Sequence, residues 1–113
     1  MDEETYQQAS VDLLLKLSNS FREIARVNDA DFIKIFPEDR GIEITVDMKP
    51  YPYVYQIEFD DSDQALILKA PKGSYYYKYV LNEQWWKCVA DDHNIEEFLM
   101  RDFAEFAKGY LHF

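Results

Sequence analysis

Residues 74–90, SYYYKYVLNEQWWKCVA, give the strongest fold signal in the chain, because aromatic and β-branched residues lie on both sides of a polar break. The first half alternates two sets of side chains, as a strand does when it presents one set to each face of a sheet. Asn82 and Glu83 supply a turn, after which the second half returns as another strand. Trp85 and Trp86 are adjacent, so their indoles point to opposite faces. The stretch therefore predicts a β-hairpin with aromatic side chains on both faces.

Four further strands are predicted before this hairpin. They are separated by residues that favour turns and span residues 32–36, 42–48, 53–59 and 65–70. Pro37 is expected to end the first of them, because proline has no amide hydrogen to give to a sheet. Pro50 and Pro52 impose an extended turn after the second. Consecutive strands with such short links are expected to pair antiparallel.

An amphipathic helix is predicted at each end of the chain. Between Glu4 and Arg26, apolar residues recur at three- and four-residue steps without an intervening Gly or Pro. A second helix begins near Ile95, after an acidic loop that can cap it, and Gly109 lies near its end. Two terminal helices can pack on the same side of a sheet. We therefore predict one α+β domain over residues 1–113, a two-layer sandwich with an antiparallel sheet of five to six strands and both helices on one face.

Composition limits the classes of partner and compartment. The chain has 22 acidic and 12 basic residues, a net charge of −10 that disfavours nucleic acid and favours basic partners or cations. No apolar run reaches the roughly 18 residues of a membrane span, and the acidic start of the chain is unlike a targeting segment. The single cysteine, Cys88, permits no internal disulfide and favours a reducing compartment. We expect a cytoplasmic protein or, if the sequence is a mature form, one of the mitochondrial matrix.

The residue patterns typical of active sites are missing from the sequence. None of the three glycines lies in a phosphate-binding loop. His93 and His112 are far apart, and Cys88 has no local signature of nucleophilic catalysis. Residues 60–63, DDSD, lack the glycine and closing glutamate of a calcium loop and are predicted to form a hairpin turn. We therefore expect a protein without enzymatic activity.

The excess of aromatic residues predicts a docking surface. Nine tyrosines and two tryptophans are more than one side of a small sheet can bury, and both residue types are favoured at protein interfaces. The alternative is ordinary pairing between neighbouring strands on an exposed sheet. The residues predicted to bind a partner on the sheet face away from the helices are Tyr53, Tyr55, Tyr76, Trp85 and Trp86.

The order of helix, six strands and helix, with an acidic surface, resembles the frataxin family of iron–sulfur cluster assembly proteins. Residues 70–73, APKG, are similar to the family's proline-containing turn, and residues 82–85, NEQW, to its polar turn before a Trp. In frataxins an Asn-Lys-Gln-type segment and a Gln-Ile-Trp segment on neighbouring strands engage the assembly scaffold. The matching positions here are residues 58–60, EFD, and 65–67, ALI, so the Trp is replaced by Ile67.

The resemblance implies an accessory protein of iron–sulfur cluster assembly that binds iron weakly and contacts a cysteine desulfurase and the cluster scaffold, as a monomer or weak homo-oligomer. Frataxins concentrate carboxylates late in the first helix and along the first strand. The corresponding candidates for iron are Glu23, Asp29 and Asp31, although Arg22 and Arg26 lie beside them and a solvated turn is the alternative. The alternative function is an acidic, non-enzymatic interaction protein: a secretion-type chaperone, an inhibitor or immunity protein, or an accessory subunit of a larger complex.

Overall fold

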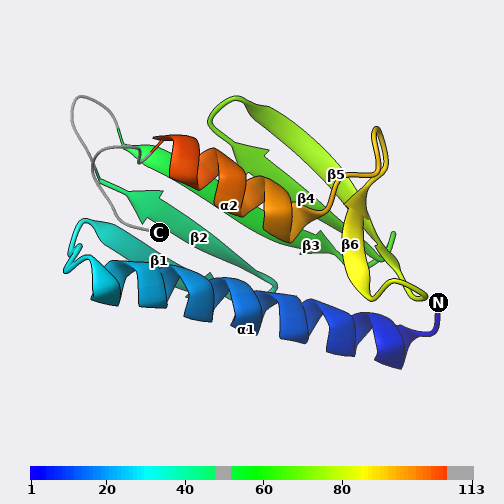
Figure 1. Cartoon of the computed structure of the whole chain (residues 1–113). Helices are drawn as coiled ribbons and strands as arrows, with labels where there is room; N and C mark the ends of the chain where they lie inside the picture. Colours follow the sequence, from blue (N-terminus) through cyan, green and yellow to red (C-terminus); the bar gives the residue numbers. More distant parts are fainter. Residues whose placement is uncertain (48–51, 107–113) are drawn as a thin grey trace.

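The computed structural model describes residues 1–47 and 52–106 and shows two layers (Figure 1). Two helices, α1 (Glu3–Val27) and α2 (Ile95–Phe106), lie on one face of a sheet. The six strands of the sheet are β1 (Ile33–Glu38), β2 (Gly41–Val46), β3 (Tyr53–Asp60), β4 (Ala65–Ala70), β5 (Gly73–Val80) and β6 (Trp85–Cys88). Neither helix of the described part is both long and apolar enough to cross a membrane.

The sheet has the simplest possible topology. Its strands lie side by side in the order in which they occur along the chain, and each neighbouring pair is antiparallel. Short links between consecutive strands allow only this hairpin-like pairing, since a parallel pair needs a long crossover connection. The predicted α+β two-layer sandwich is thereby confirmed, with six strands and both helices on one face.

Pro37 does not end the first strand as predicted. β1 continues to Glu38, and Pro37 lies opposite Ile42 in the β1–β2 pair. Because β1 is an edge strand, one of its sides has no neighbouring strand, and a residue without an amide hydrogen is tolerated there. The predicted turn around Pro50 and the helix end at Gly109 involve residues outside the described ranges.

The core lies between the helices and the side of the sheet that they cover. α1 is capped at its start by Asp2, whose side chain accepts a 2.7 Å hydrogen bond from the amide of Thr5. The rings of Phe21 in α1 and Phe103 in α2 lie 5.1 Å apart, so the two helices meet above the sheet. Alternate strand residues complete the core: Ile42, Ile44, Val46, Tyr55, Ile57, Phe59, Leu66, Leu68, Tyr77, Trp86 and Cys88.

Candidate functional site

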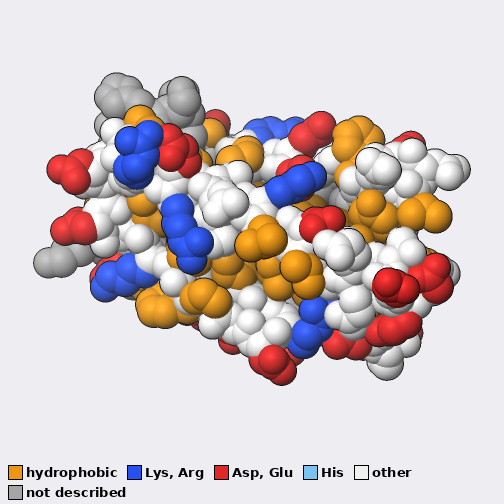
Figure 2. Space-filling view, turned by 90° about the horizontal axis from the view of Figure 1, so that it is seen from below, with side chains coloured by type: hydrophobic (Ala, Val, Ile, Leu, Met, Phe, Trp, Pro, Cys, Tyr) orange, Lys and Arg blue, Asp and Glu red, His pale blue; other side chains and the backbone are white. Residues whose placement is uncertain are grey.

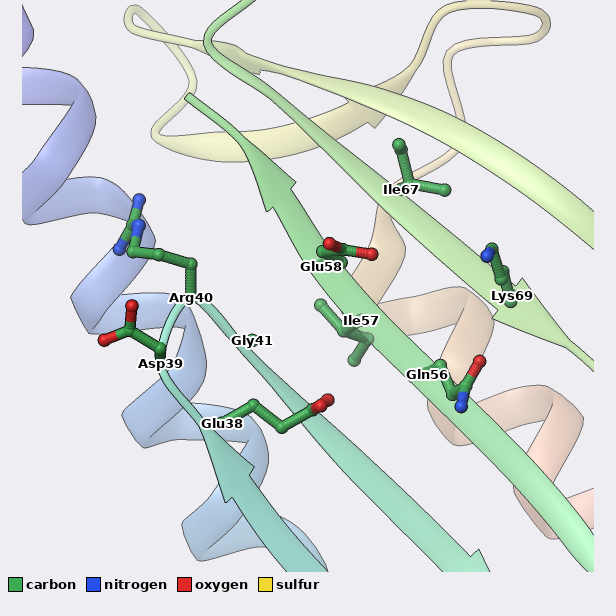
Figure 3. Close-up of a pocket in the computed structure, with 9 residues that line it drawn as sticks. All are labelled: Glu38, Asp39, Arg40, Gly41, Gln56, Ile57, Glu58, Ile67 and Lys69. Carbon is green, nitrogen blue, oxygen red and sulfur yellow. The ribbon is translucent and has the colours of Figure 1, made fainter. Parts of the chain in front are cut away.

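The open face is the side of the sheet that neither helix covers (Figure 3). Because strand side chains alternate, every second residue of each strand points there. Its apolar and aromatic members are Phe36, Val54, Ala65, Ile67, Tyr76, Val80 and Trp85. Its charged members are Lys34, Lys69, Lys78 and Lys87 with Glu38, Glu43, Glu58 and Asp60. The charges of this face therefore balance, although the whole chain has a net charge of −10.

A concavity of about 360 Å³ hollows the open face beside the β1–β2 turn (Figure 3). Gly41 lets β2 and β3 approach closely there, because a Cβ at this position would lie 2.2 Å from the carbonyl oxygen of Ile57. The wall combines acidic, basic, amide and aliphatic residues: Glu38, Asp39, Glu58, Arg40, Lys69, Gln56, Ile57 and Ile67. Such a mixture suits a polar polypeptide surface better than a closed small-molecule site, which is mostly apolar.

A group of carboxylates lies at the end of the molecule where α1 begins beside the β1–β2, β3–β4 and β5–β6 turns (Figure 1). Figure 2 shows acidic side chains crowded at this end, with hydrophobic side chains in the middle of the same view. We call this region the acidic end; its turn and helix carboxylates are Glu3, Glu4, Asp39, Asp61, Asp63 and Glu83. It borders the concavity, whose wall includes Asp39.

Two aromatic side chains of the open face are held by carboxylates of the acidic end. Tyr76 donates a 2.6 Å hydrogen bond to Asp63, and this bond to a carboxylate raises the pKa of Tyr76 to about 12. The indole Nε1 of Trp85 donates to Glu83 at 2.5 Å, and Glu83 also pairs with Lys87. Side chains fixed in this way lose less conformational entropy when a partner binds.

The structure separates the five residues that the sequence predicted for partner binding. Tyr76 and Trp85 lie on the open face, and the Trp85 residue is 37% exposed. Tyr53, Tyr55 and Trp86 instead point toward the helices, which corrects the prediction for these three.

The placement of Tyr53 and Tyr55 on the helix side of the sheet has a local cause. Tyr55 is 0% exposed and Trp86 is 2% exposed, and both belong to the core. Tyr53 and Tyr55 donate hydrogen bonds of 3.3 and 2.6 Å to Asp102 of α2. The alternation along β3 already puts Tyr53 and Tyr55 on the same side as the apolar Ile57, which signals the core face. Alternation along β4 likewise puts Ile67 on the face opposite to the buried Leu66 and Leu68, so the sequence could have identified Ile67 as a docking residue, which the prediction left out.

The three carboxylates predicted to bind iron lie near the end of α1 and the start of β1. Glu23 accepts two hydrogen bonds from the guanidinium of Arg26, and this contact lowers the pKa of Glu23. Asp29 follows the helix with a left-handed φ of 52°, and Asp31 is exposed. Within residues 1–47 and 52–106, the carboxylate oxygens of these three residues do not converge as a set of metal ligands.

A model of the frataxin-like domain matches residues 1–109 of the chain. The chain belongs to this family. Among solved structures it is similar to a frataxin from Psychromonas ingrahamii, described as a model of stability modulation within the CyaY protein family. The TM-score is 0.73 at 14% identity, over 96% of this chain and 93% of that one, which shows a shared fold. Comparison with curated protein sequences yields no match.

In this frataxin-like domain, the middle residue of each three-residue segment that resembles the scaffold-binding segments is withheld from a partner. Phe59 and Leu66 are buried in the core. Glu58 and Ile67 face outward, lie opposite each other in the β3–β4 pair, and line the concavity. The position that matches the family's Trp is therefore on the open face, occupied by a smaller aliphatic side chain.

Proposed function

We propose that this frataxin-like domain is a non-enzymatic accessory protein of iron–sulfur cluster assembly that docks through its open face onto a cysteine desulfurase and the cluster scaffold. The observation that supports this proposal most is the position of Ile67, at the concavity of the open face and on the same face of the sheet as Tyr76 of β5 and Trp85 of β6. We expect a protein with this role in the cytoplasm, or in the mitochondrial matrix if the chain is a mature form.

The charge distribution describes the partner that would fit. The open face offers apolar side chains among balanced charges, and the acidic end adds a rim of carboxylates. Interfaces commonly combine an apolar centre with a polar rim, and complementary charge at the rim speeds association. The partner surface should therefore have an apolar patch flanked by Lys and Arg. A monomer, or a weak homo-oligomer that leaves this face free, suffices for such docking.

Calorimetric titration of the chain with purified cysteine desulfurase, and separately with purified scaffold, tests the docking proposal. Ile67→Asp puts a charge at the centre of the open face and should weaken binding by about tenfold or more, as loss of a central anchor does. Leu15→Asp is the matched control, because Leu15 is 57% exposed on α1, on the other layer. Absence of wild-type binding to either protein would refute the proposal, and so would equal effects of the two substitutions.

We also propose that the chain associates loosely with iron as a cargo. Carboxylate oxygens suit iron, but Glu23 is engaged by Arg26 and the three candidate carboxylates do not converge. The residues therefore support weak contacts of single carboxylates, chiefly Asp29 and Asp31. Ferrous iron should broaden amide resonances of residues 23–31 in the wild type and less in the Asp29→Asn/Asp31→Asn variant, while Asp12→Asn behaves as wild type. Unaffected resonances in this segment would contradict the proposal.

The second candidate is an acidic interaction protein outside cluster assembly: a secretion-type chaperone, an inhibitor or immunity protein, or an accessory subunit. Ile67 in place of the family's Trp favours it, since the resemblance assigns that Trp to scaffold contact. Affinity capture with the wild-type chain and the Ile67→Asp variant separates the two functions. Capture, by the wild type only, of a basic partner that has no part in iron–sulfur cluster assembly supports this second candidate. Recovery of cluster-assembly enzymes alone contradicts it.

A further inference from the structure

A group of three potential metal ligands lies where β6 leads into α2, apart from the open face. Cys88, Asp91 and His93 each bring one ligand atom to this point, and these atoms all lie within 4.8 Å of one another. The group combines a thiol, a carboxylate and an imidazole. In the part of the chain that the structure describes, no other three Cys, His, Asp or Glu side chains converge in this way.

The backbone closes residues 88–93 into a tight loop that brings these side chains together. The amide of Cys88 donates a 2.8 Å hydrogen bond to the carbonyl of His93, and the amide of Asp92 donates one of 2.9 Å to the carbonyl of Cys88. Asp92 has a left-handed φ of 63°, which reverses the chain between Asp91 and His93. Below the loop, Lys87 and Asn94 form a β-bridge. The ligand spacing of three and two residues is thus held by main-chain bonds rather than by the side chains alone.

The His93 ring is held on both of its nitrogens. Nε2 lies 2.6 Å from the hydroxyl of Tyr77, and Nδ1 lies 2.5 Å from an Asp91 oxygen. The ring also packs against Phe98, with centroids 5.0 Å apart. A metal-bound histidine typically uses its second nitrogen for a hydrogen bond that fixes the ring, which Tyr77 provides here. Nδ1 is then the ligand, on the side of Asp91.

Access to the group is from one side. Cys88 is only 3% exposed, whereas the side chains of His93 and Asp91 are 19% and 66% exposed. An ion from solvent can therefore reach the thiol past the Asp91 carboxylate.

We propose that Cys88, Asp91 and His93 bind a divalent transition metal such as Zn²⁺, with water as the fourth ligand. Zinc binds sulfur, nitrogen and oxygen at about 2.0–2.3 Å in a tetrahedron, which requires ligand atoms roughly 3.5 Å apart. The observed group reaches this spacing by small side-chain movements. The ion replaces the thiol proton, which is released to solvent, and His93 binds through Nδ1 as the neutral tautomer that carries its proton on Nε2, beside the Tyr77 hydroxyl. The thiolate disfavours Mg²⁺ and Ca²⁺, which prefer oxygen ligands.

Cobalt(II) is the probe for this site, because a cobalt–thiolate bond gives a charge-transfer absorption band that carboxylates and imidazoles do not give. One equivalent of Co²⁺, added to the reduced full chain under a non-thiol reductant, should produce the band, and Zn²⁺ should remove it. Cys88→Ser should abolish it. Asp91→Asn and His93→Gln should weaken Co²⁺ binding at least tenfold. Asp92→Asn is the matched control, because it neutralises the adjacent carboxylate outside the group, and it should leave the band unchanged.

The outcomes decide the proposal without relying on the buried cysteine alone. If Cys88→Ser fails to fold by circular dichroism, Asp91→Asn still tests the site, because its side chain is 66% exposed. A wild-type chain without a charge-transfer band would overturn the proposal. Equal Co²⁺ affinities of the Asp91→Asn and Asp92→Asn variants would do the same. The site does not depend on docking to cluster-assembly enzymes, so neither proposal falls with the other.

Discussion

The hydroxyl of Tyr6 donates a 2.7 Å hydrogen bond to the carboxylate of Asp61, which joins the start of α1 to the β3–β4 turn across 55 residues of sequence. Arg40, from the β1–β2 turn, donates to the same carboxylate at 2.7 Å and places its guanidinium 5.1 Å from the ring centre of Phe59. One carboxylate therefore fixes a helix and two turns together at the acidic end. Of these segments, the β1–β2 turn also lines the concavity of the open face, through Asp39 and Arg40.

Removal of this carboxylate should cost stability. Asp61→Ala leaves the hydroxyl of the fully buried Tyr6 ring without its acceptor, and a loss of that kind costs about 1–3 kcal/mol in the free energy of unfolding. Urea denaturation followed by circular dichroism measures the change. Asp39→Ala is the control, since it removes an equally acidic turn residue outside the network. Equal midpoints for the two variants would show that the network does not stabilise the fold.

The same carboxylate predicts a pH dependence. Hydrogen bonds from Arg40 and Tyr6 hold the pKa of Asp61 below its usual value of 3.8. The unfolded chain therefore binds a proton here before the folded chain does, so this contribution to stability is complete above about pH 4 and is lost at lower pH. The urea midpoint of the wild type should exceed that of Asp61→Asn at pH 7, and the difference should shrink from pH 4 toward pH 2. A difference that is constant across this range would contradict the assignment.

Gly41 should tolerate no side chain. A Cβ there would lie 2.2 Å from the carbonyl oxygen of Ile57, so Gly41→Ala forces β2 and β3 apart beside the concavity. Overpacking of this kind costs about 1–3 kcal/mol or more. Gly73→Ala is the matched control, because the nearest atom to its Cβ is the Tyr75 hydroxyl oxygen at 3.6 Å. Thermal denaturation should show a lower midpoint for the first variant only; similar midpoints for both would show that the strands can separate at no cost.

The sequence predicted the fold well because its signals are local. Period-two alternation marked β2, β3 and β5, and α1 came within one residue of its predicted ends. The error at Pro37 has a different origin, because a proline is excluded from the middle of a sheet but not from its edge, and strand order is not a local property. Whether a residue such as Pro37 ends a strand thus depends on neighbours far away in sequence.

The candidate sites were harder to predict because they depend on which face is covered. Alternation along β3 puts Tyr55 on the same face as the apolar Ile57, so the burial of Tyr55 could have been predicted from the sequence of this strand. Trp86 could not be assigned in this way, since β6 has only four residues and either indole could have faced the helices. The convergence of Cys88 with His93 depends on the left-handed turn at Asp92, which the sequence does not specify. Side chains that approach through a turn of this kind are visible only in three dimensions.

The β5–β6 turn should gain stability from glycine. Gln84 has a φ of 59°, a left-handed conformation that costs a residue with a side chain about 1 kcal/mol relative to glycine. Gln84→Gly should therefore raise the free energy of unfolding by up to about 1 kcal/mol, although glycine also increases the entropy of the unfolded chain. Asn82→Gly, at a turn position without positive φ, should lower it. Loss of stability in the Gln84→Gly variant would contradict the prediction.

The contact between Tyr55 and Asp102 should couple α2 to the sheet. The Tyr55 hydroxyl donates a 2.6 Å hydrogen bond to Asp102, and Tyr55 is 0% exposed. Asp102→Ala leaves that hydroxyl unsatisfied and should cost about 1–3 kcal/mol, whereas Tyr55→Phe removes the hydroxyl itself and should cost less. The penalty of Asp102→Ala exists only while the Tyr55 hydroxyl is present. The Tyr55→Phe/Asp102→Ala double variant should therefore lose less stability than the two single variants lose together, by about 0.5 kcal/mol or more. Glu105→Ala, on the exposed side of the same helix, is the control. Strictly additive losses in chemical denaturation would show that α2 is held by its apolar contacts alone.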